Sequence, residues 1–516
     1  MKRWEIALAV AGAILLALGS FWIRRGELPR QDVTLQAGDC RLPLTILSPL
    51  AGIKPAGSVI VLHGLAANRR IMFYLGQDFA GHGFRAYLPN LPGHGDNTQP
   101  FSFARAEYCA EQAVATLMRA NHLDPANTIL LGHSMGGEIA VRMADQIPLA
   151  STIAFSPAPM VMPQRMPSNL LVFSAQFDAW QLKGQANALQ RASGGDRTAP
   201  EDFAQKRAFD LIHVPLATHT SMLDDRAVVH RAELWAMQVL YPRADQKTLA
   251  LDLDLSTYGT FGRGRLRLTG ALIGLIGIFL ILPLAISITA KAGGKAAETQ
   301  AMPPLRHWLI LAEGAVGAMV AVLLLLFGTP LRFIHLYAGD YLASEAVIMA
   351  IVILLFNRKA AHGIFSFHSR QLFCVAVLAV VVFLALGKWF DWEISSLWLN
   401  APRWIRFAEL LPFAWLFCYA EQAVLGALGA GKSRVARFGV FLGLRFEIWL
   451  ACVIGLFLLA SGQILLPILV MQFGAFSIAQ GVASDALLRR TGSATAAALF
   501  GAILAAWFVA AVFPIT

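Results

Sequence analysis

The sequence NTILLGHSMGGEIAVRMA, residues 127–144, decides the fold of the part of the chain that contains it. An apolar run typical of a buried strand leads into GHSMG at 132–136, and a helical pattern follows. A G-x-S-x-G motif between a strand and a helix is the context that a nucleophile elbow requires. Glycines flank the serine because the turn is strained and the neighbouring helix is close. Ser134 is therefore the candidate nucleophile, and the alternative is a glycine-rich turn that serves only backbone geometry.

Around this motif, apolar runs alternate with amphipathic stretches and turn clusters from about residue 26 to residue 262. Continuous apolar strands separated by helical segments predict a parallel sheet covered on both faces, so we expect an α/β fold with a mostly parallel sheet. The expected strands lie within SVIVLHG (58–64), FRAYLPNLPGHGDN (84–97), NTILLGHS (127–134), STIAFSPA (151–158), NLLVFSAQFD (169–178) and FDLIHVPLATH (209–219).

A serine hydroxyl is a poor nucleophile until a base removes its proton. The elbow fold places the partners in the chain order Ser, then Asp or Glu, then His. Asp178 lies 44 residues after Ser134, and His219 lies 41 residues further on, each just past an expected strand. We expect His219 to act as general base and then acid, and Asp178 to hold its tautomer.

The alternatives to these two residues carry less support. Asp224 and Asp225 follow the histidine in the chain, which is the wrong order. His213 lies inside a strand pattern, and we expect it to be a hydrogen-bonded structural histidine.

An oxyanion intermediate needs two backbone N–H donors. The first is expected to be Met135, the residue after the nucleophile. The second is expected to be Leu65, in the loop after the 58–64 strand.

These residues resemble the serine hydrolases of the α/β-hydrolase superfamily, most of all the monoglyceride-lipase and lysophospholipase-like branch. The matching segments are VLHGLAANRRIMFYLGQDFAGHGFRAYLPNLPGHGDN, DPANTILLGHSMGG, VFSAQFD and ATHTSM. The resemblance implies hydrolysis of an ester, less often an amide or thioester, through an acyl-enzyme, and we expect no cofactor and no metal. Many relatives insert a lid before the acid-bearing strand, but the 44 residues after Ser134 leave little room for one. The acyl pocket is then either open or covered by the membrane region.

The rest of the chain has the composition of a membrane protein. The 516 residues are 57% hydrophobic and only 14% charged, whereas about a quarter is usual in soluble domains. Residues 1–25 predict an uncleaved signal anchor, with a removed signal peptide as the alternative. Residues 263–516 predict about eight further spans, at 268–290, 308–328, 342–357, 371–387, 406–430, 438–461, 463–485 and 493–513, with the break in the 460s the least defined.

The net charge of +10 does not indicate nucleic-acid binding, because the basic residues flank apolar runs instead of clustering on one face. Their distribution favours a multi-pass protein with residues 26–262 outside the cytoplasm. The short loops and the anchor that begins with MKR favour a bacterial inner membrane. The loops assigned to the cytoplasm hold Lys291, Lys295, Arg306, Arg358, Lys359, Arg370, Lys432, Arg434, Arg437, Arg489 and Arg490. The exceptions are Arg24, Arg25, Arg263, Arg265, Arg267, Lys388 and Arg403.

Two further groups of residues invite chemical interpretations. Cys40 and Cys109 could pair in an oxidising compartment, but we expect two separate buried thiols.

The apolar runs contain the charged residues Glu313, Glu421, Arg445 and Glu447, which are functional candidates because charge is costly in lipid. The alternative for them is interhelical pairing or a position near a helix end.

We conclude that the sequence predicts a membrane-anchored serine hydrolase with a lipid or acyl-ester substrate and no nucleic-acid partner. Two other functions use the same sequence features: a transporter or lipid-handling protein with a sensing α/β domain, and an acyltransferase with the same Ser-His-Asp set. A catalytically inert binding module fits poorly with the intact set. The oligomeric state is not indicated.

Overall fold

The computed structural model describes residues 2–50, 52, 54–244, 263–294, 307–328, 333–358, 367–428, 434–459 and 466–516. Lys295, Arg306, Lys359, Lys432 and the expected break in the 460s lie outside these residues. The chain forms two compact units. The α/β unit comprises Ala17–Gly274, Trp389–Ser396 and Pro514–Thr516, and the helical unit comprises Met1–Leu16, Leu275–Lys388 and Leu397–Phe513.

The α/β unit is built on an eight-stranded sheet with the strand order β1-β2-β4-β3-β5-β6-β7-β8. Neighbouring strands from β4 to β8 run parallel, whereas β1 and β2 form an antiparallel hairpin at one edge. The predicted α/β class and all six predicted strands are therefore confirmed. The strands are β1 Arg30–Ala37, β2 Cys40–Leu47, β3 Gly57–Leu62, β4 Phe84–Pro89, β5 Thr128–His133, β6 Ser151–Phe155, β7 Leu170–Ala175 and β8 Phe209–Val214.

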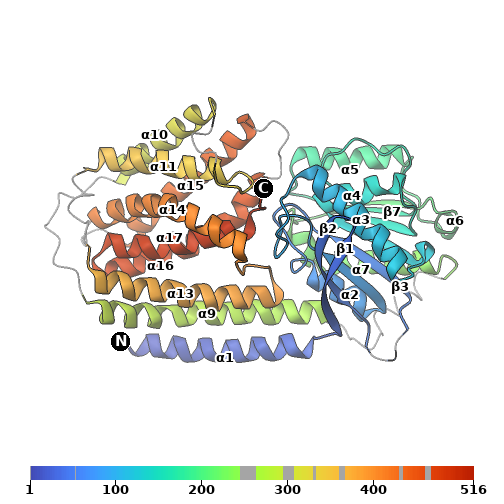
Figure 1. Cartoon of the computed structure of the whole chain (residues 1–516), viewed down its shortest axis with the longest axis horizontal. Coiled ribbons are helices and arrows are strands. Elements are labelled where there is room, and N and C mark those ends of the chain that lie inside the picture. The colour runs from blue at the N-terminus through green and yellow to red at the C-terminus, as the bar shows by residue number, and fades with distance from the viewer. Residues whose placement is uncertain are drawn as a thin grey trace. The chain divides into compact units, whose positions relative to one another are not determined.

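Helices cover both faces of this sheet (Figure 1), because alternate strand residues point to opposite sides. On one face, Ile129 and Leu131 of β5 share a core with Phe73 and Trp235. On the other face, Val172 of β7 packs among residues of the opposite helices, such as Leu189. The helices are α2 Phe73–Gly81 and α7 Arg226–Leu240 on the first face, and α3 Phe103–Ala120, α4 Met135–Arg142 and α5 Trp180–Ala192 on the second, with the short α6 Pro200–Ala204 near the edge.

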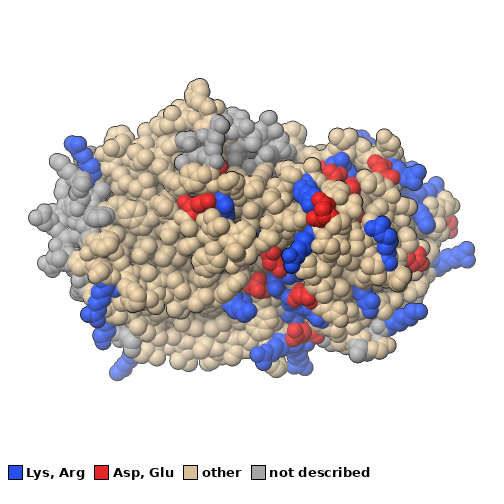
Figure 2. All heavy atoms as spheres, in the orientation of Figure 1, with Lys and Arg blue, Asp and Glu red and all other residues tan. Residues whose placement is uncertain are grey.

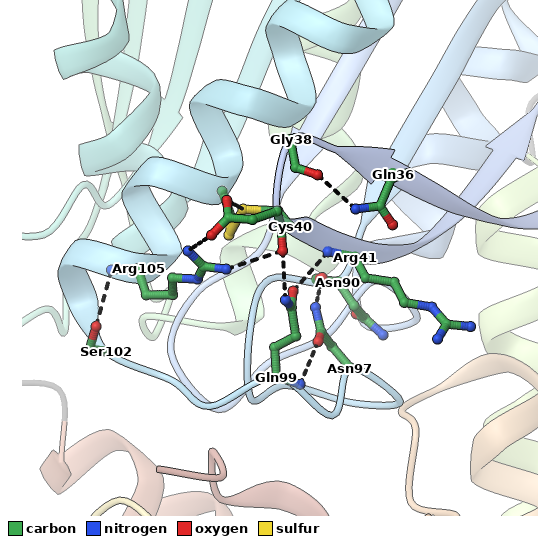
Figure 3. The surroundings of a disulfide bond; sticks show 11 residues. Gln36, Gly38, Cys40, Arg41, Asn90, Asn97, Gln99, Ser102 and Arg105 are labelled. Atoms are coloured by element: carbon green, nitrogen blue, oxygen red, sulfur yellow. Dashed lines mark hydrogen bonds and ion pairs between the residues drawn. A yellow bond between two sulfur atoms is a disulfide. The ribbon is translucent and has the colours of Figure 1, made fainter.

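A disulfide joins Cys40 at the start of β2 to Cys109 in α3 (Figure 3). The expectation of two separate thiols is therefore wrong. Helix α3 packs against the β1–β2 hairpin and brings the two Cα atoms to 5.6 Å, within the range of bridged pairs. Arg105 Nη1 adds an ion pair of 2.7 Å to Asp39 Oδ2 in the hairpin turn, so the edge of the sheet is fastened to α3 at two points.

Apolar helices dominate the rest of the chain. Among the described residues, eight helices are long and apolar enough to cross a membrane, and Figure 2 shows few charged side chains over the helical unit on the face it presents. They are α1 Arg3–Arg25, α9 Arg263–Gly293, α10 His307–Leu325, α11 Gly339–Phe356, α13 Ser369–Glu393, α14 Ala401–Ala427, α15 Arg434–Leu459 and α17 Ala494–Val512. The span expected at 463–485 falls on α16 Leu466–Thr491, which is not among the eight.

Three of the four charged candidates in the helical unit contact polar side chains of a neighbouring segment. Glu421 of α14 accepts two hydrogen bonds from Arg445 of α15, and Glu313 of α10 accepts one from Asn357. Interhelical pairing thus accounts for these three charged candidates. Arg403, an exception to the predicted charge distribution, is fully buried and donates to the carbonyl oxygens of Ala510 and Phe513 at the end of α17. A cation at a helix C-terminus satisfies carbonyl groups that have no partner within the helix.

Removal of the disulfide should destabilise the α/β unit. The bridged cysteines are 69 residues apart, and a crosslink over such a loop lowers the entropy of the unfolded chain by an amount worth roughly 4 kcal/mol. We expect the Cys40→Ser/Cys109→Ser variant to unfold at a clearly lower temperature than the parent, measured by circular dichroism in detergent. Cys374→Ser, which removes a free thiol, is the matched control and should leave the transition in place. Equal transitions in all three proteins would contradict the account.

Candidate active site

Ser134 occupies the sharp turn between β5 and α4. Its φ of 55° and ψ of −117° are unusual for a residue with a side chain. A Cβ on Gly132 would come within 2.1 Å of the Gly136 carbonyl oxygen, so the turn closes only with glycine at this position. The Ser134 N–H donates to the Phe155 carbonyl at 2.9 Å, and its own carbonyl accepts from Glu138 and Ala158. These bonds to α4 and to the end of β6 hold the strained backbone in place.

The predicted acid and base lie side by side. His219 follows β8, Asp178 follows β7, and His219 Nδ1 lies 2.8 Å from Asp178 Oδ1. The two side chains are buried. Asp178 and not Asp224 or Asp225 is therefore the carboxylate that contacts this imidazole.

Two further groups fix the Asp178 carboxylate. Its second oxygen accepts a hydrogen bond from the Ser156 hydroxyl and one of 2.9 Å from the Ala175 N–H. Burial alone would raise the pKa of Asp178, but the hydrogen bonds from His219, Ser156 and Ala175 outweigh it and lower that pKa. The carboxylate therefore stays charged beside the imidazole at neutral pH.

His133 supports the backbone of His219. Its Nε2 lies 2.9 Å from the His219 carbonyl oxygen, and the two ring centroids are 4.7 Å apart. Burial lowers the pKa of His133 to about 3, so the ring is neutral at pH 7. A neutral ring that faces a carbonyl oxygen carries its proton on that nitrogen. His133 therefore acts as a donor that positions the loop of His219.

The predicted oxyanion loop lies next to Ser134. A Cβ on Gly64 would be 3.0 Å from the Ser134 Cβ, which places the backbone before Leu65 against the elbow. Among the described residues, neither the Leu65 N–H nor the Met135 N–H has a hydrogen-bond partner. Two such unpaired donors beside a serine have the properties that an oxyanion site needs.

His63 connects this loop to the loop after β4. Its Nδ1 lies 2.9 Å from the Gly64 carbonyl oxygen, and its Nε2 accepts the Leu91 N–H at 3.0 Å. Burial lowers the pKa of His63 to about 4, which keeps it neutral. The loops after β3 and β4 are thereby joined through one side chain.

The sequence analysis missed a residue at the far end of the same loop. Asn68 donates from Nδ2 to Ser395 Oγ at 2.9 Å, and its Oδ1 accepts the Ser396 N–H. Arg70 lies 3.4 Å from Asp391 in the same segment. The loop after β3 is thus fastened to the residues that follow the apolar helix α13. The sequence holds no signal for this contact, because the partners are more than 300 residues apart.

Several apolar side chains are exposed in the segments that follow β6, β7 and β8, and one of them, Trp180, is the first residue of α5. Their exposed fractions are large: Val161 83%, Phe177 60%, Trp180 75% and Leu216 80%. The β6–β7 connection, residues 156–169, contains no helix or strand, which fits the expectation of little room for a lid. Phe177 N–H donates to the Ala217 carbonyl, so the loops of the acid and the base are joined.

The alternative residues have other surroundings. Asp225 caps α7 by accepting the N–H groups of Ala227 and Val228. Asp224 is exposed as a whole residue, although partial desolvation of its carboxyl group raises its pKa to about 6. His213, which was expected to be a hydrogen-bonded structural histidine, is exposed on β8.

Comparison with known proteins agrees with this fold. Residues 59–256 match the Alpha/beta hydrolase family. TT1662 from Thermus thermophilus is 17% identical over 42% of this chain and 100% of its own, with a TM-score of 0.33. A serine hydrolase homologue from Coxiella burnetii is 15% identical, and the match covers 42% of this chain and 97% of that protein, with a TM-score of 0.32. XC6422 from Xanthomonas campestris, a serine hydrolase without lid, is 16% identical over 44% and 92%, with a TM-score of 0.31. No curated protein matches the chain.

Most of the α/β unit thus matches the Alpha/beta hydrolase family, and this match supports a hydrolase.

Replacement of each candidate aspartate by asparagine should show which carboxylate acts with His219. Asp178→Asn keeps the shape but presents an amide to His219 Nδ1, which favours the wrong tautomer, so we expect kcat on a p-nitrophenyl ester to fall roughly 10⁴-fold. Asp224→Asn, the same exchange at the other candidate aspartate, should keep a rate near that of the parent. The reverse result, with Asp224→Asn inactive and Asp178→Asn active, would show that the acid is wrongly assigned.

Proposed function

We propose that this hydrolase is a membrane-bound serine esterase that cleaves an acyl ester through a covalent acyl-enzyme. The observation that carries the proposal is the 2.8 Å contact between His219 Nδ1 and Asp178 Oδ1, on the loops that follow β7 and β8. The third member, Ser134, stands on the strained turn after β5 in the same parallel sheet. Ligands of open α/β sheets bind at the carboxyl ends of such strands.

The chemistry assigns one task to each residue. His219 Nε2 accepts the proton of Ser134 Oγ while this oxygen attacks the carbonyl carbon of the ester. The N–H groups of Leu65 and Met135 donate to the oxyanion that forms. The intermediate collapses when His219 returns the proton to the leaving alcohol, and the acyl group stays on Ser134. Water, deprotonated by the same imidazole, then attacks the acyl carbon, the acid leaves, and His219 returns the proton to Ser134 Oγ.

Two features support an apolar, lipid-like acyl group. Val161, Phe177, Trp180 and Leu216 expose large apolar surfaces in the loops that carry or flank the acid and the base. Such exposed apolar side chains are typical of ligand or membrane contacts when they gather in one region. The loop after β3 is also bonded to Ser395 and Ser396, just beyond an apolar helix long enough to span a membrane.

The proposal includes an extracytoplasmic position for the α/β unit. Disulfides form and persist in oxidising compartments and are rare in the cytosol, so the Cys40–Cys109 bridge supports this position. The distribution of basic residues in the loops of the apolar region supports it independently.

A series of p-nitrophenyl esters with increasing acyl length tests the function. We expect turnover that rises from short to long chains in the parent protein and is lost in Ser134→Ala. Trp180→Ser should reduce kcat/KM for the long-chain ester about tenfold. The bound acyl chain would cover the Trp180 ring, and such a contact contributes roughly 1.4 kcal/mol or more.

Tyr241→Ser, which removes a half-exposed aromatic side chain at the end of α7, is the matched control and should leave the preference unchanged. Full activity in Ser134→Ala would refute the mechanism. If the parent is active but its turnover does not depend on acyl length, the proposed apolar acyl group is refuted, while the proposed esterase activity stands.

Protease treatment of intact cells that make the full chain tests the position of the α/β unit. We expect external protease to cut within residues 26–244 and to leave protected fragments of the apolar region. Cutting of this region only after the membrane has been opened would reverse the proposed orientation.

A further inference from the structure

The helical unit contains a cavity that the proposed hydrolysis does not use. It lies between α11, α14, α15 and α17, is open on one side and measures about 90 Å³. Its walls are almost entirely apolar, with Leu342, Phe413, Ile448 and Val509 as examples.

One polar group in the wall has no partner. The indole N–H of Trp449 is buried, and no group among the described residues accepts a hydrogen bond from it. A buried donor of this kind is rare in folded proteins, because a lost hydrogen bond to water is not replaced. The apolar wall of the cavity therefore includes one residue with an open donor.

The other polar side chains of the wall are already engaged. Arg445 donates from Nε and Nη2 to the two oxygens of Glu421, at 2.6 and 2.7 Å. Its guanidinium also lies 5.2 Å from the centroid of the Phe417 ring. Cys452 donates to Glu345 at 2.8 Å. The charge of Arg445 is thus neutralised, and no unpaired cation faces the cavity among the residues that the structure describes.

We propose that this cavity binds an acyl chain of an ester lipid, with the ester carbonyl oxygen accepting the hydrogen bond of Trp449 Nε1. The apolar walls match a hydrocarbon chain, and the single donor matches a neutral acceptor. A free carboxylate fits less well, because its charge would be desolvated without a counter-ion and close to Glu421. The lining helices α11, α14, α15 and α17 are apolar enough to span a membrane, so such a lipid can enter from the bilayer.

Photo-crosslinking of the full-length chain tests this site. The Ser134→Ala chain is placed in lipid nanodiscs that contain a phosphatidylethanolamine with a diazirine in one acyl chain, and the labelled peptides are mapped by mass spectrometry. This background keeps the lipid intact, so the result does not depend on the proposed hydrolysis. We expect the label on the cavity-lining parts of α14 and α17.

Variants of the wall decide whether the label reports the cavity. Trp449→Phe keeps the ring but removes the donor, and it should lower the labelling about fivefold, the equivalent of one neutral hydrogen bond. Ala506→Trp fills the chamber at a buried position and should abolish the label. Ala414→Phe fills it from a half-buried position and serves if Ala506→Trp does not elute as a folded protein.

Val380→Trp in α13 is the matched control, because Val380 is exposed and lies outside the cavity wall; its labelling should equal that of the parent. Equal labelling in the parent and both filled variants, or a label spread evenly over exposed helix faces, would overturn the proposal. A diazirine fatty acid is the second probe. The assignment to an ester would be overturned if the fatty acid labels the chain more strongly than the ester lipid and if Trp449→Phe does not change the labelling by the acid.

Discussion

The turn at Ser134 is the constraint around which the α/β unit is arranged. A side chain at φ 55° and ψ −117° is strained, and strain of this kind persists only where the surroundings determine it. Here the close approach of Gly132 to Gly136, and hydrogen bonds to β6 and α4, hold the turn. The same strand order that places β6 beside β5 brings Ser156, at its end, to the carboxylate of Asp178. The elbow and the acid are thereby connected through one neighbouring strand.

Neutral histidines hold the parts around this turn. His63 joins the loops after β3 and β4, and His133 donates to the backbone of His219. Both are buried with lowered pKa values, so neither competes with His219 as a base at neutral pH. His219, in contrast, has its Nδ1 2.8 Å from a carboxylate oxygen of Asp178. Our proposed mechanism uses this distinction.

Much of the fold was predictable because its signals are local. Strands β3 to β8 are short continuous apolar runs, and the G-x-S-x-G motif fixes the turn within a few residues. The hairpin of β1 and β2 was missed because β1 is an exposed, polar edge strand and β2 contains Pro43. Contacts between distant segments were not predictable: the Cys40–Cys109 bridge and the bonds of Asn68 to Ser395 and Ser396 depend on tertiary packing alone. Glu345 also lies within an apolar run and is fully buried, but it was not named among the charged candidates of the sequence.

The account requires above all that Ser134 is an activated nucleophile. A fluorophosphonate probe, which reacts with such serines, is added to membranes that contain the full-length chain, and the modified peptide is sequenced by mass spectrometry. We predict one phosphonylated residue, Ser134, and no reaction after Ser134→Ala. Lack of reaction in the folded parent protein, or modification of another serine at the same rate, would contradict the account.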